Sequence, residues 1–92
     1  SRFIAAHKDQ PFYVNFWTYD VHTPLVARKE LEAKYEAKRR RLGLEPKYGR
    51  EDLRDVRLVQ EHAVYAAMVE TMDAAVGQVL KTLDDLQLAD NT

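Results

Sequence analysis

Three histidines are the side chains of this 92-residue chain best suited to moving a proton near neutral pH. His22 follows an aromatic, apolar run and precedes the Thr23-Pro24 pair, and α/β folds often place functional loops directly after a buried strand. An imidazole at such a place could donate to an anionic oxygen or pass a proton. The alternative is a loop histidine that hydrogen-bonds the backbone, and the residues by themselves leave both interpretations open.

The other two histidines have structural interpretations. His7 lies beside Lys8 in a segment that ends before Pro11, where a cationic group suits the C-terminus of a helix. His62 lies near the start of a long amphipathic pattern, and Glu61 and His62 do not form the H-E-x-x-H pair of a zinc protease. We therefore expect His7 and His62 to be surface residues without a chemical role.

Two acidic residues, Glu70 and Asp73, are three positions apart and fall on one side of the same predicted helix. Carboxylates in this arrangement could bind a metal ion. Two carboxylates without a histidine or further acids make a weak ligand set, however. A hydrogen-bonding or capping role inside the fold is the expected one, and we predict no metal ligand in this chain.

The overall composition excludes several functions. Fourteen basic and fifteen acidic residues leave the chain almost neutral, which gives no electrostatic reason to bind nucleic acid or an anionic membrane. The Lys38–Arg41 run has acidic residues around it and is expected to be a solvated helix face. The absence of cysteine excludes a disulfide scaffold, a thiolate zinc site and a cysteine nucleophile in these residues. No apolar run approaches the roughly 18–20 residues of a membrane span.

The hydrophobic pattern predicts a mostly helical chain with one strong strand. The run Phe12–Trp17 is almost entirely aromatic or β-branched and lacks alternation, which favours a strand buried on both faces whose neighbours lie elsewhere. Gly77 interrupts an amphipathic helix at a cost of about 1 kcal/mol relative to alanine, which suggests close packing against a neighbour. We expect a helix end over 1–10, a strand over 11–18, a loop over 19–27, a charged helix over 28–42, an irregular insertion over 43–57 with a short helix from about Glu51, and a long amphipathic helix over 58–87.

Five short motifs, in order along the chain, resemble the sulfatase family of the alkaline-phosphatase-like superfamily. The arylsulfatase and N-acetylgalactosamine-6-sulfatase-like branch is the most similar. Each motif alone is weak, but the ordered set covers nearly the whole chain. The motifs are Pro11-Phe12, His22-Thr23-Pro24, Glu30-Leu31 with Lys34-Tyr35, Tyr65-Ala66-Ala67-Met68 with Glu70 and Asp73, and Asp90-Asn91-Thr92.

The resemblance implies an α/β parent fold with helices on both faces of a large mixed sheet. It also implies hydrolysis of a sulfate ester by a formylglycine nucleophile beside a calcium ion. In that family the histidine of the H-x-P loop contacts the sulfate group and helps to protonate the leaving alcohol, a role that falls here on His22. Sulfated small molecules or glycans are the implied substrates, and a periplasmic, secreted or lysosomal location is implied as well.

Several motifs of the family are missing from the 92 residues. There is no cysteine and no C/S-x-P-S-R motif to make the nucleophile, and neither the paired aspartates nor the D-N-G of the calcium site is present. We therefore expect an internal fragment of a sulfatase catalytic domain that is inactive alone and associates with itself. Two alternatives stay open: a helical interaction module that uses the Tyr65–Leu86 face, and a fragment of a phosphodiesterase or phosphonate hydrolase of the same superfamily.

Overall fold

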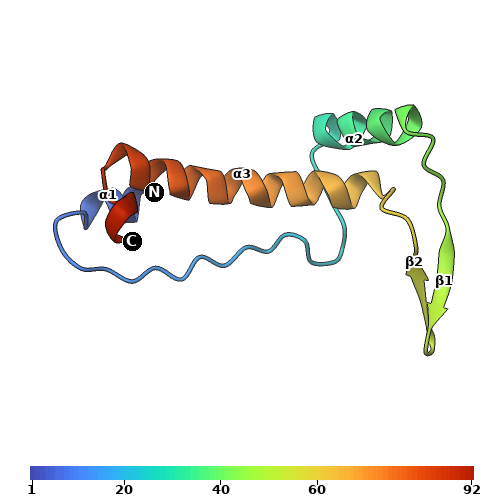
Figure 1. The fold of residues 1–92 in the computed structure, drawn as a ribbon, viewed down its shortest axis with the longest axis horizontal. Coiled ribbons are helices and arrows are strands. Elements are labelled where there is room, and N and C mark those ends of the chain that lie inside the picture. Colours follow the sequence, from blue (N-terminus) through green and yellow to red (C-terminus); the bar gives the residue numbers. More distant parts are fainter.

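The computed structural model describes all 92 residues and contains one long helix with five shorter elements arranged along it (Figure 1). The three α-helices cover 41 residues, so the chain is partly rather than mostly helical. The two strands form one small sheet, which lies beyond the N-terminal end of the long helix (Figure 1). In chain order the elements are α1 (Arg2–Ala6), α2 (Lys29–Arg41), β1 (Tyr48–Glu51), β2 (Arg54–Arg57), α3 (Ala63–Asp85) and the 3-10 helix η1 (Ala89–Asn91).

The long helix α3 organises the chain. Helix α2 packs on its N-terminal part, whereas α1 and η1 lie at its C-terminal end, where both termini are found (Figure 1). The helix begins five residues later than the predicted position 58, because the backbone N–H of Leu58 still donates to the carbonyl of Lys47 beside the hairpin. None of the helices combines the length and the apolarity that a membrane span requires.

Gly77 was expected to permit close packing, yet it has no neighbour in this chain. A Cβ atom added there would meet nothing within 4 Å. The residues of this chain therefore give no packing reason for a glycine in the middle of α3. If such a reason exists, it lies in whatever covers this face of the helix.

The segment over 43–57 contains a β-hairpin in place of the short helix predicted from about Glu51. Strands β1 and β2 pair antiparallel, with Glu51 opposite Arg54, so only Asp52 and Leu53 form the turn. Asp52 has a φ of 51°, a left-handed conformation that aspartate adopts more readily than most residues. The strands are largely polar, which is why hydrophobic periodicity did not reveal them.

The strand predicted over 11–18 is not formed. These residues run as an extended connection from α1 towards α2, without strand hydrogen bonds (Figure 1). Tyr13 and Trp17 are 85% and 84% exposed, so the predicted burial on both faces is also absent. A strand needs a neighbouring edge to pair with, and the only two strands of the chain pair with each other.

Little of the chain is buried. The core consists of Ile4, Ala67 and Met68, and Glu61 is the one buried charged residue. The accessible surface of 7763 Å² exceeds by about 2,300 Å² that of a compact monomer of the same mass. The radius of gyration is 18.1 Å, against about 12 Å for a compact domain of this length. The chain has the dimensions of an open assembly of elements, with much apolar surface uncovered.

Candidate functional site

His22 lies in a compact turn that precedes α2. The backbone N–H of His22 donates to the carbonyl of Tyr19 at 2.9 Å, which closes the turn. The Tyr19 hydroxyl donates to the carbonyl of Thr23 at 3.2 Å, and its ring centroid lies 5.4 Å from that of the imidazole. Every hydrogen bond made by the side chains of the turn stays inside it, and His22 is exposed.

The ring of His22 has a defined orientation because its Nδ1 lies 2.6 Å from the carbonyl oxygen of Thr23. A carbonyl accepts only, so Nδ1 carries a proton, and this assignment follows from the hydrogen bond. In the neutral ring Nε2 is then an acceptor, and in the imidazolium it is a second donor. When the His22 ring is charged, its Nε2 can therefore donate a proton to an anionic oxygen, while Nδ1 remains hydrogen-bonded to the backbone.

A charged cluster joins α2 to α3 beyond the His22 turn. Lys34 Nζ donates to both carboxylate oxygens of Glu70, at 2.8 and 2.7 Å. The hydrogen bond from Lys34, with a smaller effect of the neighbouring Tyr35 hydroxyl, lowers the pKa of Glu70, and the proximity of Glu70 raises the pKa of Tyr35. Glu70 thus has the hydrogen-bonding role expected from the sequence. Asp73 acts on Tyr35 only through its charge.

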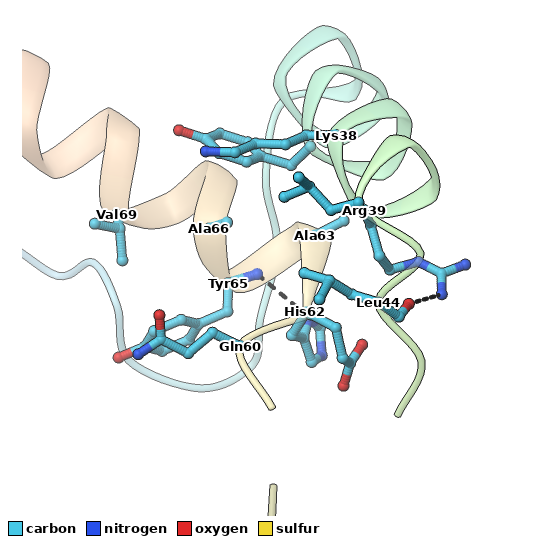
Figure 2. Close-up of a pocket in the computed structure, with 12 residues that line it drawn as sticks. Lys38, Arg39, Leu44, Gln60, His62, Ala63, Tyr65, Ala66 and Val69 are labelled. Atoms are coloured by element: carbon cyan, nitrogen blue, oxygen red, sulfur yellow. Dashed lines mark hydrogen bonds between the residues drawn. The ribbon is translucent and has the colours of Figure 1, made fainter. Parts of the chain in front are cut away.

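A groove of about 630 Å³ lies between the C-terminal part of α2 and the first turns of α3 (Figure 2). Leu44 and Arg39 enter it from the α2 side, and Tyr65 and Val69 enter it from α3 (Figure 2). Most of its lining is apolar. His62 lies at its edge as the N-cap of α3, where its Nδ1 accepts from the backbone N–H of Tyr65 at 3.3 Å. His62 therefore has a structural role.

Two of the four basic residues at the end of α2 are paired within the helix. Arg39 and Arg40 both donate to the carboxylate of Glu36, at 2.9 and 3.1 Å. These two hydrogen bonds lower the pKa of Glu36 from its usual 4.5 to about 2. Arg39 also donates to the carbonyl of Leu44 at 3.0 Å. Arg39 and Arg40 thus hold the end of α2 together.

The three histidines are not gathered into one site. His7 Nδ1 contacts the carbonyl of Phe3 at 2.8 Å, and its ring stacks on that of Phe3 at α1. His62 caps α3, and only His22 lies in a turn between helices. No group of three or more histidine, cysteine, aspartate or glutamate side chains is placed to hold a metal ion.

Sequence reasoning missed two ion pairs, one between residues far apart in the chain and one beside the hairpin. Lys34 and Glu70 are 36 positions apart, and only the packing of α2 on α3 brings them together. Buried Glu61 pairs with Arg57 at the exit of the hairpin, four residues earlier. Lys34, Tyr35 and Glu70 were all named as members of family motifs, and this was the one available signal that they act together.

The residues of this chain do not fit the two groups that the resemblance implies. Calcium needs six to eight oxygen ligands, and no acidic cluster of the required size is present. Formylglycine requires a cysteine or serine in its motif, and the chain has no cysteine and a single serine, Ser1, without that motif. These residues by themselves therefore supply neither group, and His22 is the side chain of the chain best suited to proton transfer.

The sequence of the whole chain matches a known family. The family model described as Sulfatase aligns with residues 1–92. The chain belongs to the sulfatase family. Membership implies the alkaline-phosphatase-like α/β fold for the family, of which this chain contributes helices, an extended connection and a hairpin.

Three curated sulfatases illustrate the similarity. A protein named Sulfatase from Formosa agariphila is 36% identical over 77 residues, which cover 84% of this chain and 11% of that protein. The N-acetylgalactosamine-6-O-sulfatase of Bacteroides thetaiotaomicron is 29% identical over 98% of this chain and 13% of its own length. The steryl-sulfatase of Homo sapiens is 29% identical over the full chain and 12% of its own length. The chain thus spans about an eighth of these sulfatases, and no solved structure matches it.

Proposed function

We propose that this chain is part of a sulfatase that hydrolyses sulfate esters, and that it contributes the histidine that contacts the sulfate group. His22 would hold the sulfate through Nε2 and donate a proton to the oxygen of the leaving alcohol. A developing negative charge on that oxygen is stabilised by a donor within hydrogen-bond reach. The substrate class is a sulfated small molecule or glycan, and the location is periplasmic, secreted or lysosomal, as in the family.

The observation that carries the proposal is the hydrogen bond between His22 Nδ1 and the Thr23 carbonyl. A histidine whose Nδ1 is held by the backbone presents Nε2 in a fixed direction, as a proton donor in catalysis requires. The exposure of the ring leaves room for a ligand. The family match over the whole chain and the three sulfatase relatives give the type of ester.

Calcium and formylglycine belong to the proposal for the complete enzyme and are supplied by residues other than these 92. Formylglycine provides the nucleophile when present, and calcium provides positive charge beside it. The part of this chain is to bind and orient the sulfate and to hold a proton at Nε2 of His22. We accordingly propose that the 92 residues alone have no sulfatase activity.

The test uses the complete enzyme with His22→Ala and a matched histidine variant, His7→Ala, at the end of α1. General acid catalysis by a positioned side chain contributes about 10²- to 10⁴-fold, so His22→Ala should lower kcat/KM for an aryl sulfate by a factor in that range. His7→Ala should leave it unchanged. Equal activity of the two variants would overturn the role of His22, and faster turnover of the matching aryl phosphate would favour a phosphate ester as substrate.

A second candidate function is an interaction module, and the uncovered apolar surface favours it. Tyr65, Val76 and Leu80 on α3 are 45%, 40% and 56% exposed, and the aromatic side chains of the extended segment are exposed as well. Such patches commonly mark interaction sites. We propose that the isolated chain associates with itself through them, whereas in the complete enzyme the rest of the domain covers them.

A further inference from the structure

The His22 turn has no hydrogen bonds to any other element of the chain. Its hydrogen bonds, from Thr18 to Thr23, are all internal. The preceding residues 11–17 make no backbone hydrogen bonds, so nothing upstream fixes the turn until α1. Downstream, α2 begins at Lys29, seven residues after His22. Within this chain α2 is therefore the nearest ordered element that can hold the turn in place.

One carboxylate joins α2 to α3 by an ion pair. The Lys34–Glu70 pair is the only ion pair in the chain that joins two different helices. The Tyr35 hydroxyl, one residue along α2, also lowers the pKa of the same carboxylate. The Glu70 side chain is 29% exposed, which is low for a carboxylate and indicates that it lies between the helices.

We propose that Glu70 is a positioning residue for His22: through its ion pair with Lys34 it fixes α2 on α3, and α2 in turn places the His22 turn at the sulfate group. This inference rests on the proposed function of His22. It assigns to Glu70 no contact with the substrate.

The charges in the cluster keep it intact over a wide pH range. The hydrogen bond from Lys34 lowers the pKa of Glu70, and the contact with Glu70 raises the pKa of Lys34. Because the pKa of Glu70 is lowered, the ion pair is lost at low pH only as pH falls through that lowered value. Because the pKa of Lys34 is raised, the ion pair is lost at high pH only as pH rises through that raised value. Both changes lie far from neutral pH. The Lys34–Glu70 ion pair is therefore intact around neutral pH.

The test is a double-mutant cycle in the complete enzyme with Glu70→Gln and His22→Ala. A small displacement of a catalytic group can cost up to about 100-fold, so Glu70→Gln should lower kcat/KM for an aryl sulfate by about 10- to 100-fold. In the His22→Ala background the same substitution should change kcat/KM by less than about twofold, because its effect passes through His22. A purely structural role predicts the same loss of activity in both backgrounds, as would a loss of folded enzyme.

The matched control is Asp85→Asn, which removes the Lys81–Asp85 ion pair within α3 at 2.7 Å and leaves α2 untouched. It should leave kcat/KM unchanged. If Glu70→Gln does not fold, Tyr35→Phe removes only the hydroxyl contact and should give a smaller loss that also disappears with His22→Ala. If Tyr35→Phe lowers kcat/KM equally with His22 present and with His22→Ala, the proposal is overturned.

The two proposals fail in different ways. If His22→Ala lowers activity but Glu70→Gln does not, Glu70 has no positioning role and the proposed function stands. If His22→Ala has no effect, the proposed function is wrong and the positioning role of Glu70 falls with it.

Discussion

Replacing Gly77 by alanine is expected to have opposite effects in the isolated chain and in the complete enzyme. In the isolated chain an added Cβ meets nothing within 4 Å, so the substitution has no steric cost. Alanine favours a helix over glycine by about 1 kcal/mol, which shifts the equilibrium between formed and unfolded α3 about fivefold. Thermal melts followed by circular dichroism, together with amide exchange along α3, should show greater stability of the helix.

In the complete enzyme the same methyl group would have to fit against the segment that covers α3. Adding a methyl group to a packed interface costs about 1–3 kcal/mol, which outweighs the gain in helix propensity. The control is Ala74→Gly, an exposed alanine on the same helix, which should destabilise both forms by about 1 kcal/mol. Destabilisation of the isolated chain by Gly77→Ala would refute the reasoning, and so would equal stabilisation of both forms.

Three further predictions concern the chain alone. Because Arg39 and Arg40 lower the pKa of Glu36 from 4.5 to about 2, the stability they give to α2 is full above about pH 4.5 and is lost as pH falls towards 2. Circular dichroism should therefore show a loss of helix in this range that Glu36→Gln removes, and an equal loss in the variant would contradict the assignment. The purified chain should not turn over a chromogenic aryl sulfate, and measurable turnover would contradict the fragment interpretation. Light scattering should give a mass above the 10.7 kDa of a monomer, with Trp17→Asp lowering it, whereas a monomeric mass at high concentration would count against association.

The helices could be predicted from sequence because their signals are local. The spacing of apolar residues from Tyr65 to Leu86 marked α3, and the charged run closed by Gly43 marked α2. The start of α3 was misplaced because Leu58 extends the apolar pattern, while its backbone belongs to the exit of the hairpin. Local patterns thus locate a helix, but they do not show where the backbone begins to hydrogen-bond with a neighbouring element instead.

The strand prediction shows where local information ends. The composition of Phe12–Trp17 correctly indicates an extended backbone (Figure 1), but a strand also requires hydrogen-bonding partners, which this chain does not supply. The hairpin was missed for the opposite reason, since its largely polar strands pair without an apolar signal. The Lys34–Glu70 pair depends on helix packing and could not be read from spacing.

The most direct test of the central claim, that His22 donates a proton to the leaving oxygen of a sulfate ester, is the dependence of kcat/KM on the leaving group. A donor matters most when the leaving alcohol is weakly acidic, because more charge develops on its oxygen. In the complete enzyme, the loss caused by His22→Ala should therefore grow steadily from strongly acidic to weakly acidic phenols across a series of aryl sulfates. The same loss for every ester, or none at all, would contradict the assignment.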